Sequence, residues 1–589
     1  MSSGIGLVLS IAKDALAAQQ YGIYVTSHNI ANVNTPGYSK QTAVFEAKKP
    51  APFGGVLLGR GVDTTEIVRA SDQIIENRVM QQKSSLYCYK EMENYMLAME
   101  GLFNENSDTS LSTMLGEFWN LWHDISNDPS GAAERIALYE HSLLISQQFK
   151  SIDSDLLQLN TDLTNAVKAG VGRVNEITAA IANLNNEIAG LEIDASANDL
   201  RDQRNVLASE LAEYIDMKIF EQSNGAFTIV SAKGVVLVDG NDGYDIELDG
   251  SSVKWQGSGG NEVDITDNIS KGKLGGWLDM RDEIVAKYKQ DLTELASEFI
   301  WAVNKQHSQG VGLTTFSSAT GTYGASAPGA ALTSSASGLD YYEKISGGTF
   351  EVWLYDSTDT LANGGGTTVT VTAGVTTLND IATAITALDP DISASVNADG
   401  KLAITTTNNH TFAFSDDTSN VLAALGINTF FTGSAAGGMG VNDVIGSDKD
   451  YIAAAKIDSD VTSSGYGTFA TGDNTNALAI VDLQYTSMSV SEWTYDRING
   501  NTEGTSTATI EEYYHSLVGS LGIKGSSISR SRAFNEVMVN ELKTMRESIS
   551  SVSLDEEMTQ LMQYQHAFAA GAKLVSVSDE MLQTLLGVK

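Results

Sequence analysis

The sequence predicts a multidomain α+β protein with paired N- and C-terminal coiled-coil helices, a rod domain of long helices, and inserted β-rich outer domains. Three observations lead to this prediction. Apolar residues recur in alternating steps of four and three at both ends of the chain, which is the pattern of a coiled-coil seam. The same helical period returns in several long stretches between the ends. Two further regions shift to short alternating segments with Gly, Thr, Ser and Asp, as strands joined by turns do.

The first stretch, residues 1–45, carries an apolar seam that ends in an asparagine-rich turn. Only Gln19 and Thr26 are polar among its seam positions. Pro36 disfavours helical backbone at the residue before it, and Pro36-Gly37 fits the two central positions of a type II turn, so the helix is expected to end there. We expect this seam to carry assembly contacts, and its principal residues are Ile5, Leu9, Leu16, Ile23 and Ile30.

The last stretch repeats the seam over a similar length. Ser553 and Glu556 form a capping box, so a helix is expected to begin there. Among its seam positions only Gln565 and Asp579 are polar. Two unrelated amphipathic core helices would also produce such patterns, but matched seams at opposite ends favour their pairing. The seam residues of this segment are Leu554, Met558, Leu561, Phe568, Val575, Leu582 and Leu586.

Net charge argues against two classes of partner. The 589 residues include 36 Lys and Arg against 74 Asp and Glu, a formal charge of -38, so neither nucleic acid nor an anionic membrane is expected to bind. Residues 1–37 differ from the rest, because Lys13 and Asp14 are their only charged side chains apart from histidine. A segment so poor in charge is expected to be buried.

The length predicts about four domains, and the changes in composition indicate that these are nested. Helical segments enclose one small β unit and one larger region rich in Gly, Thr, Ser and Ala. We expect an inner coiled-coil domain of residues 1–45 with 550–589, a helical rod domain of 46–218 with 268–310 and 474–549, a small β unit of 219–267, and β-rich outer domains within 311–473.

Motif searches predict no enzyme, no cofactor and no metal site. The seven histidines show no ligand spacing, and the sequence contains no H-E-x-x-H, no G-x-S-x-G, no Walker loop and no dinucleotide fingerprint. Asp239, Asn241, Asp242 and Asp245 have the composition of a calcium loop, but their spacing fails the EF-hand pattern and suits a hairpin turn. We therefore expect no catalytic chemistry.

Two further features bear on where the protein is found. Cys88 is the single cysteine, so no intrachain disulfide can form.

The apolar run that begins at Ile5 could be mistaken for a signal peptide, but no Lys or Arg precedes it and the heptad continues through the apparent cleavage site. No apolar run is long enough to span a membrane. We expect neither a cleaved leader nor a membrane helix.

Several stretches together resemble one family, the rod, hook and hook-associated proteins of the bacterial flagellum. The turn contributes Asn29, Asn32, Asn34, Pro36, Gly37 and Tyr38 as its family motif. Lys40 stands where arginine is common in that family, which preserves the charge. The similar stretches are NIANVNTPGYSKQ at 29–41, NDLRDQRNVLASEL at 198–211, AVNKQHSQG at 302–310, TGDNTNALAIVDLQ at 471–484, and SVSLDEEMTQLMQYQHAFAAGAKLVSVSDEMLQTLL at 551–586.

The resemblance implies a structural role in motility. It implies a ring layer of identical subunits between hook and filament, with the hook protein on one side and the second hook–filament junction protein on the other. It also implies type III export without a cleaved signal peptide and an extracellular place in the flagellum. We expect an export chaperone to bind the C-terminal helix, because that seam is apolar and exposed before assembly. Inner coiled-coil ends and outward-facing inserted domains are expected from the same resemblance.

Two alternatives stay open. The chain could be another flagellar axial protein, a hook protein or a flagellin, although the stretches at 198–211 and 302–310 disfavour this. The β region 311–473 could instead act as an adhesin or carbohydrate-binding module, in which case the purified region would bind glycans or host cells.

Overall fold

A computed structural model describes residues 2–587 except 54–55, 104–109, 193–195, 232–233, 258 and 363. The chain divides into two compact units, each assembled from segments that are distant in sequence. None of the helices in the described part of the chain has the length and apolarity of a membrane span. Unit 1 consists of Met1–Asn94, Asp162–Met280 and Ser526–Lys589, and unit 2 of Tyr95–Thr161 and Arg281–Gly525.

Long helices dominate, and strands occupy the intervening segments, which confirms a mixed α and β protein with long helices. A π-helical segment, Met280–Val285, joins α6 to α7. The helices are α1 (Ser2–Ala31), α2 (Gln73–Leu102), α3 (Leu111–Asn127), α4 (Ala132–Leu191), α5 (Asn198–Tyr214), α6 (Gly272–Asp279), α7 (Ala286–His307), α8 (Leu378–Thr386), α9 (Val421–Leu425), α10 (Asp443–Ser447), α11 (Thr475–Val481), α12 (Ile510–Ser550) and α13 (Leu554–Gly587).

The strands of unit 1 form small antiparallel sheets. Two hairpins follow α1: β1 (Gln41–Ala47) pairs with β4 (Val62–Arg69), and β2 (Ala51–Phe53) pairs with β3 (Val56–Leu58). Between α5 and α6 lie a four-stranded and a three-stranded sheet. Their strands are β5 (Met217–Glu221), β6 (Phe227–Ser231), β7 (Val236–Asp239), β8 (Asp242–Gly243), β9 (Ile246–Asp249), β10 (Ser252–Gln256) and β11 (Glu262–Asp264).

Unit 2 contains the other strands, again in antiparallel pairs. Two three-stranded sheets have the orders β12-β16-β15 and β14-β13-β17. The strands are β12 (Ser318–Thr320), β13 (Gly348–Tyr355), β14 (Thr367–Val371), β15 (Ile392–Val396), β16 (Leu402–Thr406), β17 (Thr411–Ser415), β18 (Phe431–Thr432), β19 (Gly440–Val441), β20 (Met488–Thr494) and β21 (Thr502–Ala508).

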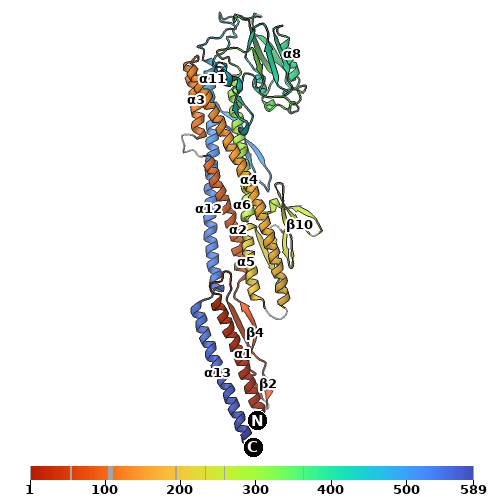
Figure 1. The fold of residues 1–589 in the computed structure, drawn as a ribbon, viewed down its shortest axis with the longest axis vertical. Coiled ribbons are helices and arrows are strands. Elements are labelled where there is room, and N and C mark those ends of the chain that lie inside the picture. Colours follow the sequence, from red (N-terminus) through yellow and green to blue (C-terminus); the bar gives the residue numbers. More distant parts are fainter. Residues whose placement is uncertain are drawn as a thin grey trace. The chain divides into compact units, whose positions relative to one another are not determined.

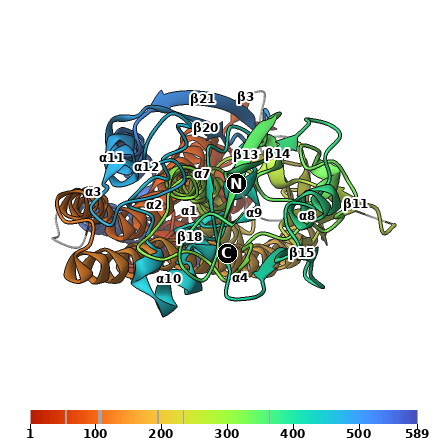
Figure 2. The same cartoon turned by 90° about the horizontal axis from the view of Figure 1, so that it is seen from above.

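In unit 1 the first and last helices pack side by side and run antiparallel (Figure 1). A Cβ atom built on Gly22 of α1 would lie 2.8 Å from the ring of Tyr564 in α13. One built on Gly571 of α13 would lie 3.2 Å from the Leu16 side chain of α1. The two ends of the chain therefore lie near each other, as both views show (Figures 1 and 2).

The buried line between these helices differs in part from the heptad count. On α1 the predicted Leu9 is 39% exposed, and Leu16, Ile23 and Ile30 are half-buried, as is Ile5. Ala12 and Thr26, which belong to the heptad count, are buried, and so are four positions outside it, Ala18, Gly22, Val25 and Asn29.

On α13 four of the seven predicted seam residues are half-buried and three are exposed. Leu561, Phe568, Val575 and Leu582 are half-buried, whereas Leu554, Met558 and Leu586 are exposed. Of the positions between them, Gly571 and Ser578 are small, whereas the ring of Tyr564 packs over Gly22 of α1. The line of α13 is Glu557, Leu561, Tyr564, Phe568, Gly571, Val575, Ser578 and Leu582.

Unit 2 is centred on an aromatic core between α3 and α7. Phe118 packs edge-on against Trp119 and Phe299, with ring centroids 5.0 and 5.2 Å apart. Phe430 and Phe431 complete the cluster. Helix α11 lies beside α3 in both views (Figures 1 and 2).

The apolar pattern of residues 476–489 predicts one helix, and this prediction is too long. The structure has α11 followed by a 3-10 turn, Asp482–Tyr485, and strand β20 begins at Met488. In β20 only Val490 is fully buried, and the other residues of this strand are partly or fully exposed. This alternation with a single buried apolar residue gives too weak a period to separate from the end of a helix.

Candidate functional site at the asparagine-rich turn

The N-terminal turn has the predicted geometry. The amide of Tyr38 donates to the carbonyl of Thr35 over 3.2 Å, which closes a turn with Pro36 and Gly37 at its centre. Gly37 has φ +82°, as the third residue of a type II turn requires. A Cβ atom there would lie 2.3 Å from a methyl group of Val206 in α5. The glycine thus allows both the turn and its close approach to α5.

Asn29 is the hub of this region in unit 1, and it is 1% exposed. Its amide nitrogen donates to the Gln41 carbonyl and to Oε2 of Glu557, each over 2.9 Å. Its oxygen accepts the amide of Gln41 at 3.0 Å and the hydroxyl of Tyr38 at 2.7 Å. Every polar atom of the side chain is therefore used, and one residue joins α1, the start of β1 and the start of α13.

Glu557 is fully buried at the first turn of α13. The Nζ of Lys40 lies 3.1 Å from Oε1 of Glu557 and 3.2 Å from Oε2 of Glu556. Burial lowers the pKa of Lys40, but its hydrogen bonds to the two carboxylates outweigh burial and the net pKa is raised. The backbone amide of Lys40 also donates to the last carbonyl of α12, at Ser550, over 2.9 Å. Lys40 therefore fixes the break between α12 and α13.

The start of α5 completes this polar cluster, which is called the node below. Its residues are Asn29, Tyr38, Ser39, Lys40, Gln41, Arg69, Asp199, Asp202 and Glu557. Asp202 accepts from the amide of Ser39 at 2.8 Å, from its hydroxyl at 2.9 Å, and from Nη1 of Arg69 at 2.8 Å. Burial raises the pKa of Asp202, although these three donors act in the opposite direction. Asp199 accepts from the Gln41 side chain at 2.8 Å. The node thus holds the turn, β1 and β4 against α5.

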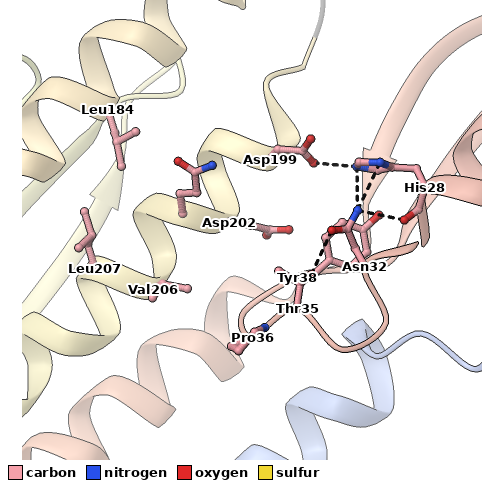
Figure 3. Close-up of a pocket in the computed structure, with 11 residues that line it drawn as sticks. His28, Asn32, Thr35, Pro36, Tyr38, Leu184, Asp199, Asp202, Val206 and Leu207 are labelled. Carbon is pink, nitrogen blue, oxygen red and sulfur yellow. Dashed lines mark hydrogen bonds and ion pairs between the residues drawn. The ribbon is translucent and has the colours of Figure 1, made fainter. Parts of the chain in front are cut away.

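A cavity of about 520 Å³ opens beside this node within unit 1 (Figure 3). His28 reaches Asp199 across its polar side, with Nε2 3.3 Å from Oδ1. Leu184, Val206 and Leu207 form an apolar side. Burial, together with the nearby carboxylates of Asp199, Asp202 and Glu557, raises the pKa of Tyr38 far above its ordinary value, so its hydroxyl stays protonated and acts as a donor.

The hydrogen bonds and ion pairs of this region indicate a structural role. Among the described residues no group of three or more His, Cys, Asp or Glu is placed to hold a metal ion. The carboxylates of the node are occupied by lysine, arginine, amide and hydroxyl donors. The arrangement ties α1, α5, β1, β4 and α13 into one structure.

A second polar cluster lies in unit 2, at the end of α7. Asn304 accepts the amides of Phe430 and Phe431 at 3.0 and 2.8 Å and donates to the Phe431 carbonyl. His307 is 1% exposed; its Nδ1 contacts the Asn428 carbonyl at 2.8 Å and its Nε2 accepts the amide of Ala453 at 2.9 Å. Burial lowers the pKa of His307 to about 4. The imidazole is therefore neutral and fixed at both nitrogens.

The structure separates the predicted motif residues into two groups. Asn29, Gly37 and Tyr38 lie in the node, and Asn32 donates to the carbonyl of His28 at 3.0 Å. Asn34 and Pro36 are exposed, and Pro36 lines the cavity beside Tyr38 (Figure 3). Sequence reasoning did not identify Glu557, Asp202 or Arg69 as site residues. The first two stand within stretches that carried the family resemblance, which was the one available signal.

Family models of flagellar proteins match both ends and the middle of the chain. Residues 96–322 match the family described as the flagellar hook-associated protein FlgK helical domain. Residues 9–38 match the flagella basal body rod protein family, and 546–588 match the C-terminal family of the flagellar basal body rod FlgEFG proteins.

Curated relatives align over almost the whole chain. The flagellar hook-associated protein 1 of Bacillus subtilis strain 168 is 25% identical over 98% of this chain and 97% of its own length. Those of Salmonella typhimurium and Escherichia coli K12 are 25% and 26% identical over 99% of this chain and all of their own lengths.

One solved structure shares the fold. It is the flagellar hook junction protein FlgK from Burkholderia pseudomallei, with a TM-score of 0.50 and 16% identity. The match covers 81% of this chain and all of that one.

Proposed function

Because the chain belongs to the flagellar hook-associated protein 1 family, we propose that copies of it assemble as a ring layer that joins the hook to the filament of a bacterial flagellum. The role is structural and serves motility. The observation that carries the proposal is the near-full-length similarity to proteins of that name in three bacteria. The hook protein and the second hook–filament junction protein are the expected neighbours.

The inner part of this layer would be a coiled-coil domain of residues 1–45 with 550–589. The antiparallel packing of α1 on α13 supports this assignment. In the same proposal, residues 46–218, 268–310 and 474–549 form the helical rod domain, and the β segments 219–267 and 311–473 face outward. The matches of 9–38 and 546–588 to rod protein families support an inner place for the two ends.

The outer faces of the terminal helices would make the contacts between subunits. Leu9 of α1 and Leu554, Met558 and Leu586 of α13 are exposed in the single chain, although they belong to the predicted assembly seam. Exposed apolar stripes of this kind mark protein interfaces. Before assembly, the same face of α13 would be the surface that an export chaperone covers.

Export and location follow from the same proposal. The chain would leave the cell through the flagellar type III apparatus as an unfolded polypeptide, without a cleaved signal peptide, and take its place outside the cell. Its single cysteine and low proline count, 6 in 589 residues, are compatible with such a route.

Electron microscopy of reconstituted hooks tests the proposal. Purified chain is mixed with isolated hooks of the source bacterium, beside versions that lack 1–37 or 553–589. The full chain is expected to add a discrete layer at the distal end of the hooks, and the truncated versions are expected to add none. Equal binding by the truncated versions, or no layer from the full chain, would contradict it and favour another axial role or an adhesin.

A further inference from the structure

The β2–β3 hairpin of unit 1 exposes an apolar strand on both sides. Val56, Leu57 and Leu58 are 62%, 70% and 37% exposed. Successive side chains of a strand point to opposite faces, so exposure of all three means that neither face of β3 is covered. A two-stranded hairpin is at best marginally stable alone in water. This one is therefore expected to gain its order from a partner.

The base of the hairpin is fixed to the first half of α1. Nζ of Lys48 lies 2.9 Å from Oδ2 of Asp14. A Cβ atom on Gly61 would lie 3.4 Å from the Cα of Ile11. Since Leu16 of α1 packs near Gly571 of α13 in this antiparallel pair, the hairpin lies at the level where α13 runs from Gly571 towards its C-terminal end.

Charge distinguishes the hairpin from the rest of the chain. Residues 47–62 contain Lys48, Lys49 and Arg60 and no acid, in a protein with a net charge of -38. Lys49 and Arg60 are exposed, and among the described residues no carboxylate pairs with either. The hairpin thus presents apolar side chains beside two unpaired cations.

A surface of complementary character lies on α13 at the same level. Leu574, Val577 and Met581 are 49%, 39% and 52% exposed, and their spacing places them on one face of the helix. Glu580, three residues after Val577, borders this face, and no Lys or Arg occurs from 574 to 588. The three-residue strand and the span from 574 to 581 are each about 10 Å long, so the two surfaces also agree in length.

We propose that the β2–β3 hairpin of one copy packs on the Leu574–Val577–Met581 face of α13 in a neighbouring copy, with Lys49 and Arg60 near Glu580. The proposal rests on the assembly of identical subunits proposed above. It assigns a contact between copies to a surface that the heptad seams do not include. Opposite charge fixes the orientation of the contact, and the apolar residues supply its buried area.

Disulfide cross-linking in assembled flagella tests this contact. Two separately tagged chains are co-expressed in the source bacterium, one with Leu57→Cys and one with Val577→Cys, both carrying Cys88→Ala. Oxidation of isolated flagella is expected to shift both tags to a band with the mass of a dimer, since a disulfide forms only when the two Cβ atoms approach within about 4.5 Å.

The matched control replaces Val577→Cys with Ala572→Cys. Ala572 is exposed on the same helix, but it lies on the side opposite the proposed contact. Dimer from the Ala572 variant at the same yield, or a cross-link from Leu57 to a protein of another mass, would overturn the proposal.

A charge reversal separates failure of this contact from failure of the ring. Arg60→Glu is expected to reduce the fraction of isolated hooks that carry the added layer, and Glu580→Arg in the same chain is expected to restore it. Layers that form normally with Arg60→Glu, and without the cross-link, would contradict the hairpin contact and leave the junction role intact. Absence of any layer from the unmodified chain would contradict the junction role itself.

Discussion

At the scale of single residues, Asn29 shows how one amide side chain can join three segments. It is buried, and its two donors and its acceptor oxygen serve Gln41, Tyr38 and Glu557. Leaving a buried polar partner unsatisfied costs about 1–3 kcal/mol, and more for a charged group. The loss of a hydrogen bond is expected to cost most at the buried carboxylate of Glu557, because it is charged.

Asn29→Ala is therefore expected to weaken the node by roughly 3 kcal/mol. The measurement is the urea concentration at which the added layer dissociates from isolated hooks. Asn34→Ala is the control, because Asn34 is exposed on the same turn. Equal urea midpoints for the two variants would contradict the role assigned to Asn29.

His307 leads to a prediction about pH. Its pKa falls from 6.5 to about 4 on folding, so between these values the unfolded chain binds a proton that the native chain does not. The free energy of unfolding therefore falls as the pH falls through this window, by up to roughly 3 kcal/mol at about 1.4 kcal/mol per pH unit. Above pH 6.5 the contribution is fully present.

Urea unfolding of the purified chain, followed by tryptophan fluorescence between pH 4 and 7, measures this effect. Trp122 reports locally, since its ring lies 6.3 Å from that of His307. His307→Gln is expected to reduce the loss of stability on acidification, and the exposed His123→Gln serves as control. The same pH dependence in all three chains would show that His307 is not its source.

At the scale of elements, the pairing of α1 with α13 depends on small residues where the helices meet. A Cβ atom on Gly22 would lie 2.8 Å from the Tyr564 ring, whereas one on Gly6 would meet nothing within 4 Å. Alanine in a helix interior is favoured over glycine by about 1 kcal/mol. The two glycines therefore separate helix propensity from packing.

Gly22→Ala is expected to lower the urea midpoint of the assembled layer, because the added methyl group displaces Tyr564. The free-energy cost of this displacement is expected to exceed the gain in helix propensity. Gly6→Ala is expected to leave the midpoint unchanged or to raise it. A higher midpoint for Gly22→Ala than for Gly6→Ala would show that the helices separate enough to admit the methyl group.

The helices could be predicted from the sequence, but the line along which they meet could be predicted only in part. A count of apolar residues selected Leu554 and Met558, which are exposed, and passed over Glu557, Gly571 and Ser578, which are buried. A glycine or serine carries no apolar signal even where it permits close approach. The turn at Pro36-Gly37 was predictable because its chemistry is local.

The polar node could not be derived in this way, since its contacts join residues hundreds of positions apart. Asn29 with Glu557, and Ser39 with Asp202, pair without any periodicity. The motif stretches indicated which segments carry constrained side chains, but not which segments meet.

At the scale of the whole molecule, the terminal helices expose more apolar surface than a single chain can cover. Val8, Leu9 and Tyr24 of α1 and Met562 and Met581 of α13 are each between 39% and 66% exposed. A segment that cannot bury enough apolar surface gains its order on binding. We therefore expect the terminal pair to be largely open in the free monomer and to close on assembly.

Hydrogen exchange followed by mass spectrometry checks this expectation. Amides of α1 and α13 in the purified monomer are expected to exchange rapidly, while those of the aromatic core around Phe118 stay protected. The terminal amides are expected to become protected once the chain is added to hooks. Strong protection of α13 in the monomer would contradict the expectation.

The antiparallel pairing of the first helix with the last also sets an order of events. Whatever emerges first at a ribosome or an export channel must wait for its packing partner until nearly the whole polypeptide has followed. A chain that stops early leaves α1 without α13, and the buried Asn29 without Glu557. In the proposed assembly, the pair therefore tests whether a chain is complete, because only a full-length chain can pair α1 with α13 and join the layer.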